Sequence, residues 1–286
     1  MPTQQTSTPN LYHYIVSKLA GHFENQEAQA LARIVVEDIL NLPFPHVLAG
    51  ISPAISVQEG QKLDLCIQRL LADEPIQHII GHCIFYDRPF VVNPSVLSPR
   101  PETEQLVSMA LNLPTLPKQA VVMDACTGSG CIAVSIKAER PEWQVFACDV
   151  SSDALHVAAQ NAKLHNADVV FSHLDILSPE RPEGPFDIIV SNPPYVLDKE
   201  KPSMKSQVLN HEPHLALFVS DDNPLIFYQA LAAWGRQSLR SGGWVLVEIN
   251  PLLSSETLQL FAQQGFINCD IITDIFDKQR FIQCQK

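Results

Sequence analysis

The sequence predicts an α/β protein in which a helical domain precedes a doubly wound, seven-stranded sheet. Three observations carry this prediction. Residues 11–71 have apolar side chains at helical spacing, residues 82–93 have the pattern of a β-hairpin, and from residue 120 short β-rich runs alternate with helical stretches. Strands that alternate with helices are typical of a mainly parallel sheet with helices on both faces.

The helical region shows one clear helix start. Apolar residues recur at four-residue spacing from Leu11 onward, which places them on one helix face. Ser56 and Glu59 form an S-x-x-E capping box that predicts the start of a further helix. Because no residue pattern here indicates chemistry, we expect residues 1–80 to form a helical substrate-recognition domain.

A connector of residues 81–118 follows the helical region. Its first part, HCIFYDRPFVVN, predicts a hairpin that turns near Asp87 and Arg88. Its end, LPTLPKQ at residues 113–119, has the prolines and polar residues of a linker. The sheet domain is therefore expected over residues 119–286.

The sheet domain contains seven candidate strands. These runs are residues 120–125, 143–150, 168–176, 186–192, 242–249, 268–275 and 280–284. Helical stretches at 131–140, 152–165 and 224–240 separate most of them. No helix pattern separates the last two runs, which predicts a final antiparallel hairpin.

The first four strands end in side chains suited to ligand binding, namely Asp124, Asp149, Asp175 and Asn192. In open α/β sheets, ligands bind beyond the carboxyl ends of the strands. GSGCIA, which begins at Gly128, fits the G-x-G-x-x-A nucleotide-binding turn, and Asp149 follows at the distance of the acid that binds ribose hydroxyls. This turn fits both NAD and S-adenosylmethionine, because both cofactors contain an adenosine ribose.

The stretch SNPPYV at residues 191–196 favours one of these cofactors. Pro fixes φ and lacks an N–H, so Asn192 and Pro193 should form a stiff, extended segment with free carbonyls. The Asn192 side-chain carbonyl and the Pro193 backbone carbonyl can each accept one N–H of an amine or amide, while Tyr195 covers its flat face and stabilises growing positive charge. An acid such as Asp124, before the glycine turn, also suits an ammonium and a sulfonium. We therefore expect methyl transfer from S-adenosylmethionine to a planar nitrogen.

The chain resembles the HemK/PrmC family of glutamine-N5 methyltransferases, which modify peptide chain release factors. The resemblance covers nearly the whole chain and is carried by EPIQHIIG (74–81), SPRPETE (98–104), DACTGSGCIAVSI (124–136), ACDVSSDALHVAAQNA (147–162), SNPPYV and HEPHLAL (211–217). SPRPETE is the specific marker, because many methyltransferases share the glycine turn and DNA amino-methyltransferases share NPPY. The resemblance implies a Rossmann-like methyltransferase sheet, S-adenosylmethionine as cofactor, and class I release factors as protein substrates.

The resemblance also implies the site residues. Residues 126–130 should enclose the methionine part of the cofactor, Asp149 should hold the ribose, and Ile176 should flank the adenine. The full set of cofactor-binding positions is Asp124, Cys126, Thr127, Gly128, Ser129, Gly130, Asp149, Ile176 and Asn192. The catalytic positions that should hold the glutamine amide are Asn192, Pro193, Pro194 and Tyr195.

The chain departs from the family pattern at several positions. Cys126 stands where Gly is usual, and Asn250 and Leu253 stand where Gly and Gln are usual, which leaves the polar role of the EINPLLS loop open. The long polar segment at residues 196–223 is a candidate flap over the substrate. The His pairs at 78/82 and 211/214 are interrupted by Gly81 and Pro213, and the cysteines are expected to be buried free thiols, so no metal is expected.

Charge and cysteine usage bound the partners. The net charge of −12 repels phosphate backbones, and we expect a monomer that binds a protein but no nucleic acid and no membrane. Seven cysteines without a C-x-x-C pair, and a start without a secretory signal pattern, favour the cytoplasm. The alternatives are methylation of a ribosomal-protein glutamine, DNA adenine-N6 methylation and an NAD-dependent oxidoreductase.

Overall fold

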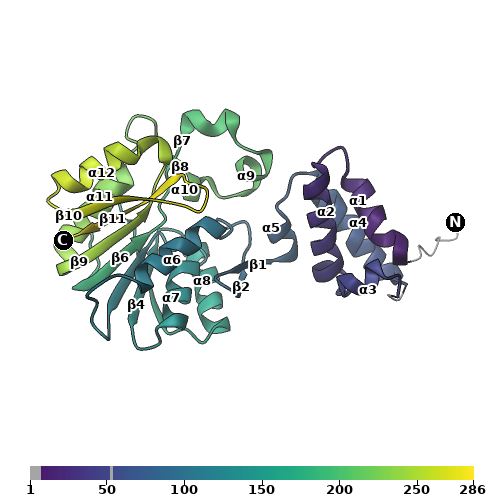
Figure 1. The fold of residues 1–286 in the computed structure, drawn as a ribbon, viewed down its shortest axis with the longest axis horizontal. Coiled ribbons are helices and arrows are strands. Elements are labelled where there is room, and N and C mark those ends of the chain that lie inside the picture. Colours follow the sequence, from purple (N-terminus) through teal and green to yellow (C-terminus); the bar gives the residue numbers. More distant parts are fainter. Residues whose placement is uncertain (1–7, 52–53) are drawn as a thin grey trace. The chain divides into compact units, whose positions relative to one another are not determined.

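A computed structural model describes residues 8–51 and 54–286, which belong to two compact units (Figure 1). The helical unit comprises Met1–Gly81 with Lys205–His211, and the sheet unit comprises His82–Met204 with Glu212–Lys286. The predicted β-hairpin is therefore part of the sheet unit.

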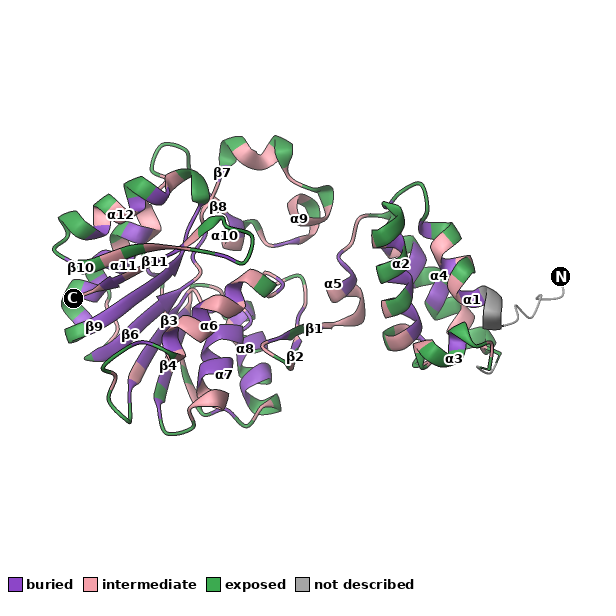
Figure 2. Ribbon diagram, viewed as in Figure 1, coloured by how far each residue is buried: buried purple, intermediate pink, exposed green. Residues whose placement is uncertain are grey.

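The helical unit is built from short helices around an apolar core. Its elements are α1 (Thr8–Leu19), α2 (Asn25–Ile34), the π-helical turn η1 (Val35–Ile39), α3 (Phe44–Leu48), α4 (Val57–Leu71), α5 (Ile76–Ile80) and α9 (Ser206–His211). The predicted capping box is confirmed at the start of α4, where Glu59 N donates to Ser56 Oγ over 3.3 Å and Ser56 N donates to Glu59 Oε2 over 2.6 Å. Buried stripes along α2 and α4 supply much of the core (Figure 2).

The segment α9 is attached to this unit by polar contacts. Ser206 Oγ donates to Asp73 Oδ2 over 2.7 Å, and His211 Nε2 lies 3.0 Å from the carbonyl oxygen of Ala72. The middle of the segment predicted as a flap is thus held by the helical unit.

The sheet unit contains the seven predicted strands, in the order β10-β11-β9-β6-β3-β4-β5. Their bounds are β3 (Val121–Ala125), β4 (Gln144–Asp149), β5 (Val169–His173), β6 (Phe186–Ser191), β9 (Leu239–Glu248), β10 (Ile267–Thr273) and β11 (Gln279–Gln285). The strands from β9 to β5 pair in parallel, while β11 runs antiparallel to both its neighbours, so the predicted final hairpin is confirmed.

Helices cover both faces of this sheet (Figure 1). The helices α6 (Glu104–Leu111), α7 (Cys131–Glu139) and α8 (Ser152–Leu164) share one core cluster, and α11 (Ile226–Ser238) and α12 (Ser254–Gln263) share another. Along β6, Ile188 and Val190 belong to the first cluster and Ile189 to the second. This alternation is what a period of two residues requires of a strand that is buried on both faces.

The hairpin consists of β1 (His82–Phe85) and β2 (Arg88–Val91), with Phe85 paired to Arg88. Its turn residues are Tyr86 and Asp87, one position earlier than predicted, and both have positive φ, at 49° and 58°. A two-residue turn that matches the twist of the strands requires positive φ at both positions, and Asp tolerates this conformation. The buried ring of Phe85 joins the core under α6, α7 and α8.

The segment after β6 is built of short elements. In the sheet unit these are β7 (Val196–Leu197), η3 (Asp198–Ser203), α10 (His214–Leu217) and β8 (Phe218–Val219), with β7 and β8 paired in parallel. Two further 3-10 turns, η2 (Pro101–Thr103) and η4 (Pro251–Leu253), lie at the carboxyl edge of the sheet unit.

Candidate active site

The loop after β3 is shaped by positive φ angles. Cys126, Gly128 and Gly130 have φ of 60°, 55° and 78°. A Cβ added at Gly130 would lie 3.0 Å from the Cβ of Ala158 on α8, so this glycine also permits close packing of the loop on the helix. Cys126 adopts the same left-handed conformation at the cost that an L side chain carries there.

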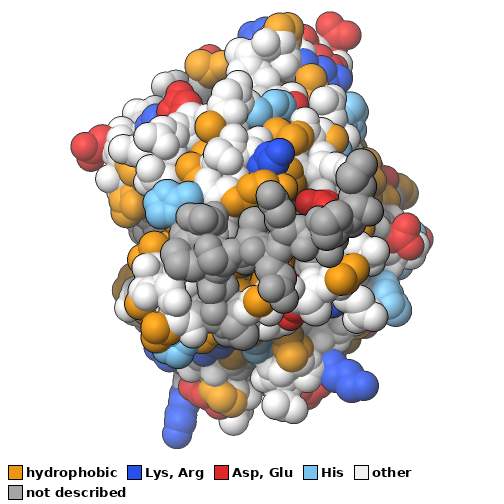
Figure 3. Space-filling model, turned by 90° about the vertical axis from the view of Figure 1, so that its right-hand side faces the viewer, with side chains coloured by type: hydrophobic (Ala, Val, Ile, Leu, Met, Phe, Trp, Pro, Cys, Tyr) orange, Lys and Arg blue, Asp and Glu red, His pale blue; other side chains and the backbone are white. Residues whose placement is uncertain are grey.

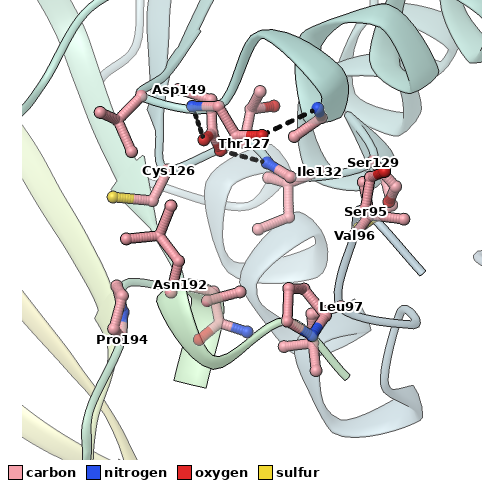
Figure 4. A pocket seen from close by; sticks show the side chains of 18 of the residues that line it. Ser95, Val96, Leu97, Cys126, Thr127, Ser129, Ile132, Asp149, Asn192 and Pro194 are labelled. Carbon is pink, nitrogen blue, oxygen red and sulfur yellow. Dashed lines mark hydrogen bonds between the residues drawn. The ribbon is translucent and has the colours of Figure 1, made fainter. Parts of the chain in front are cut away.

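Two carboxylates bind the backbone and side chains of this loop. Thr127 Oγ1 donates to Asp124 Oδ2 over 2.6 Å, and Ala133 N donates to the same oxygen over 3.2 Å. From the next strand, Asp149 Oδ2 accepts the N–H of Gly128 over 2.8 Å (Figure 4). The loop is thereby fixed between the carboxyl ends of β3 and β4.

Asp124 lies behind the loop and not on the surface of the adjoining cavity. Its side chain is fully buried, burial raises its pKa to about 7, and Oδ1 finds no hydrogen-bond partner among the described residues. Gly130 likewise faces Ala158. Of the predicted cofactor positions, these two do not line the cavity, and direct contact of Asp124 with the cofactor stays a prediction.

A cavity of about 230 Å³ opens beside the loop, and seven of the nine predicted cofactor positions line it (Figure 4). They are Cys126, Thr127, Gly128, Ser129, Asp149, Ile176 and Asn192. The segment from Ser95 to Arg100, which contains the start of SPRPETE, forms another part of the wall.

The chemistry of this wall fits S-adenosylmethionine. Each oxygen of Asp149 accepts one backbone N–H, from Gly128 over 2.8 Å and from Ser151 over 2.9 Å. Since the two carboxylate oxygens together have about four lone-pair sites, Asp149 retains acceptor capacity for the ribose. The apolar side chains of Ile176 and Phe227 supply surfaces for an adenine ring.

A second cavity, of about 60 Å³, adjoins the NPPY stretch. Asn192, Pro193 and Tyr195 line it, together with Glu248. Asn192 lines the larger cavity as well, as does Pro194. The structure therefore brings the four predicted catalytic residues to the junction of the two cavities.

Thr103 and Glu248 complete this junction, and neither was among the predicted site residues. Thr103 Oγ1 donates to Glu248 Oε2 over 2.7 Å, and Tyr195 OH donates to Glu248 Oε1 over 2.9 Å. Asn192 Nδ2 in turn donates to Thr103 Oγ1 over 3.2 Å. Glu248 is 1 % exposed, and this burial raises its pKa, while the two hydroxyl groups oppose the shift.

The EINPLLS loop has a polar role, although its sequence departs from the family pattern. Asn250 Nδ2 donates to the carbonyl oxygen of Tyr195 over 3.0 Å and to Glu200 Oε2 over 2.7 Å. Asn250 thus connects the end of NPPY to η3. Spacing gave no sign of this contact, because the partners lie 55 and 50 positions apart.

The described residues contain neither a metal-binding cluster nor a membrane-spanning helix. Over residues 8–51 and 54–286, no group of three or more His, Cys, Asp or Glu side chains could hold a metal ion. No helix in these same ranges has the length and apolar character needed to cross a bilayer.

Comparisons with known proteins identify the family of the chain. Residues 104–215 match the family Methyltransferase small domain, and residues 10–81 match the family PrmC N-terminal domain. The release factor glutamine methyltransferase of Bacteroides thetaiotaomicron is 37% identical over 274 residues, covering 96% of this chain and 98% of the relative. Its counterpart in Flavobacterium psychrophilum is 38% identical and covers 94% of this chain and 95% of the relative.

A solved structure shares the fold. A methyltransferase from Pyrococcus furiosus has a TM-score of 0.52 at 18% identity, covering 77% of this chain and 96% of that one. The predicted α/β fold, the cofactor S-adenosylmethionine and the resemblance to the HemK/PrmC family are confirmed. The chain belongs to the family of release factor glutamine methyltransferases, which use S-adenosylmethionine to methylate a protein.

Proposed function

We propose that this chain transfers a methyl group to the side-chain amide nitrogen, N5, of the glutamine in the Gly-Gly-Gln motif of class I release factors. The observation that carries the proposal is the position of Asn192, which lines both the larger cavity that fits the cofactor and the smaller one beside NPPY. A glutamine amide in the smaller cavity would therefore meet the cofactor at Asn192.

The residues around the smaller cavity suit an amide nucleophile. The amide nitrogen is a weak nucleophile because its lone pair is delocalised, so positioning and charge stabilisation carry the catalysis. When bound, the cofactor would supply an electrophilic methyl group, and the amide proton released on transfer would pass to solvent water. Asn192 Oδ1 and the Pro193 carbonyl accept the amide N–H groups, and the Tyr195 ring covers its flat face.

The helical unit is proposed to bind the release factor. Three observations support this role: the match to the PrmC N-terminal domain, the attachment of α9 from the flap segment, and exposed apolar side chains. Leu48, Val57 and Leu65 expose 55%, 68% and 57% of their surface. On the face that Figure 3 shows, the described Lys and Arg side chains lie apart among hydrophobic and acidic ones.

The setting of the reaction follows from this partner. Release factors act in translation, so we propose the cytoplasm as the compartment. We propose the monomer as the acting form.

The test offers labelled S-adenosylmethionine and three acceptors to the wild type and to the Asn192→Ala variant. The acceptors are an intact release factor, the same factor with its Gly-Gly-Gln glutamine replaced, and double-stranded DNA. We expect label on the intact factor alone, and a rate lowered by about 10²–10³ in the variant, the scale of a lost transition-state hydrogen bond.

The control variant is Asn112→Ala, an exposed position after α6, which should keep the wild-type rate. Label on DNA would favour an adenine methyltransferase instead. Equal label on the glutamine-replaced factor would also contradict the proposal. Transfer to a ribosomal protein but not to a release factor would move the activity to the alternative substrate.

A further inference from the structure

A buried carboxylate lies behind the amide site and contacts it through two hydroxyl groups. Glu248 is the last residue of β9, which pairs with β6 in the sheet, and NPPY follows β6 directly. Its Oε1 accepts a hydrogen bond from the Tyr195 hydroxyl over 2.9 Å, and its Oε2 accepts one from the Thr103 hydroxyl over 2.7 Å. One carboxylate thus binds Tyr195, which lines the smaller cavity, and Thr103, which lines the larger one.

The direction of these hydrogen bonds is set by the chemistry of the groups. In its ionised form Glu248 is an acceptor only, so in that form the Thr103 hydroxyl donates its single hydrogen bond to Glu248. The Thr103 oxygen then has only lone pairs left for its other neighbour. Asn192 can meet it with Nδ2 but not with Oδ1, and the contact of 3.2 Å is made by Nδ2.

This chain of donors removes the two-fold ambiguity of the Asn192 amide. The two ends of an amide group have nearly the same shape, so packing alone distinguishes them poorly. If the group were turned over, Oδ1 of Asn192 would face the oxygen of Thr103, and two acceptors would be in contact without a proton between them. Among the described residues, no group donates a hydrogen bond to Asn192 Oδ1. That oxygen is available to a ligand.

We propose that Glu248 and Thr103 are positioning residues that orient the Asn192 carboxamide so that its oxygen, and not its NH₂ group, faces the substrate. The inference rests on the proposed function and deepens it. A substrate nitrogen that carries N–H groups finds an acceptor in this orientation, whereas the reversed amide would present donor to donor. The same carboxylate holds the Tyr195 ring, so the amide acceptor and the aromatic cover are fixed together.

The arrangement is sheltered from water, which would otherwise compete for these hydrogen bonds. Glu248 is 1 % exposed and Thr103 is 3 % exposed. Thr103 is the last residue of η2, inside the SPRPETE stretch, and thus belongs to a different segment from NPPY. Through Thr103, the SPRPETE stretch thus has a specific positioning role at the amide site.

The test compares Thr103→Val, which keeps the side-chain shape without the hydroxyl, with Thr103→Ser, which keeps the hydroxyl. With an intact release factor as acceptor, we expect kcat to fall about 10–100-fold in Thr103→Val, the scale of a misplaced contact group, and to stay within about threefold of the wild type in Thr103→Ser. The calorimetric affinity for S-adenosylmethionine should stay within about threefold in both variants.

A second readout needs neither cofactor nor release factor. In an amide NMR spectrum of the full-length protein, the Asn192 side-chain signals are identified by their absence from the Asn192→Asp variant. We expect one Nδ2 proton to be protected from exchange with water in the wild type and in Thr103→Ser. This protection should be lost in Thr103→Val.

Glu248→Gln gives an independent variant. A Gln side chain presents one donor and one acceptor, so one of the two hydroxyl contacts must reverse or break. We expect a lower kcat with preserved cofactor affinity and a changed Asn192 or Tyr195 signal. Wild-type kcat in both Thr103→Val and Glu248→Gln would overturn the proposal, as would equal losses in Thr103→Val and Thr103→Ser. If the wild type itself fails to methylate the factor, the proposed function fails, whereas the NMR readout still tests the orientation.

Discussion

Two buried carboxylates hold two neighbouring loops at the same edge of the sheet, but they do so over very different distances in the chain. Asp124 binds Thr127 and Ala133, which lie three and nine positions away. Glu248 binds Thr103 and Tyr195, which lie 145 and 53 positions away. The cofactor loop therefore depends mainly on nearby residues and on Asp149 of the next strand, whereas the amide site needs segments that are far apart in the chain.

This difference means that cofactor binding and the positioning of the substrate amide depend on different sets of contacts. The loop after β3 owes its shape to positive φ angles and to carboxylates that accept its own N–H and hydroxyl groups. The NPPY loop owes its orientation to side chains from two other segments, around Thr103 and Glu248. Changes in the contacts of the loop after β3 should consequently alter cofactor binding. Changes in the contacts of the NPPY loop should alter the methyl-transfer rate.

The largest expected effect on the cofactor side is at Asp149. If its carboxylate accepts the ribose hydroxyls, Asp149→Ala should weaken S-adenosylmethionine by about 1.5–3 kcal/mol, the scale of hydrogen bonds to a charged group. That corresponds to roughly 10–150-fold in Kd. Isothermal titration calorimetry measures this change, and the Asn192 side-chain NMR signals should stay where they are.

The matched control is Asp153→Ala, which removes an exposed acid from the first turn of α8. It should leave the affinity unchanged. An unaltered Kd in a folded Asp149→Ala variant would remove Asp149 from the cofactor site. A shift of the Asn192 signals would show that the cofactor loop and the NPPY loop are coupled, which would contradict their independence.

Local rules explain why much of the fold could be predicted. The capping box at Ser56 and Glu59 involves neighbours in the sequence, and it is present as predicted. The seven strands were predicted from short β-rich runs between helical stretches, and the sheet has all of them. The hairpin turn was placed one residue late, because positive φ at Tyr86 is set by the twist of the paired strands and not by its own preference.

Local rules also separate the parts of the candidate site that could be predicted from those that could not. The positive φ of Gly128 and the stiffness of NPPY are properties of the residues themselves, so motif spacing located both loops. The bonds from Glu248 to Thr103 and Tyr195 depend on the strand order that places β9 beside β6, which no local pattern contains. The burial of Asp124 behind the glycine turn is likewise not contained in the spacing, so its contact with the cofactor stays a prediction.

The next expected effect is a pH dependence that belongs to the amide site. Burial raises the pKa of Glu248, as does the nearby Glu102 to a smaller extent, and Arg280 opposes them. The ionised form is the acceptor that both hydroxyls need, so kcat should fall as the pH falls through this pKa. Because the pKa is raised, the fall begins above the usual range of a glutamate near 4.3, with a slope of roughly tenfold per pH unit.

Measurements of kcat at a series of acidic pH values test this decline, the acid limb of the pH profile, in the wild type and in Glu248→Gln. The variant has no carboxyl to titrate, so its limb should disappear while its plateau rate is lower. Circular dichroism at each pH controls for unfolding. An identical acid limb in the two proteins would assign the titration to another group.

The smallest expected effect tests the claim that backbone conformation governs the cofactor loop. Cys126 has a φ of 60°, where the family usually has Gly. Cys126→Ala and Cys126→Gly both remove the thiol, so their difference isolates the Cβ in this left-handed conformation. A Cβ in the left-handed conformation costs about 1–2 kcal/mol. Gly avoids this cost but loses roughly 0.5–1 kcal/mol more chain entropy on folding. We therefore expect the Gly variant to be more stable than the Ala variant by about 0.5–1 kcal/mol. Urea unfolding measures this difference, and an Ala variant as stable as the Gly variant would mean that the loop relaxes around its side chain instead of imposing its conformation.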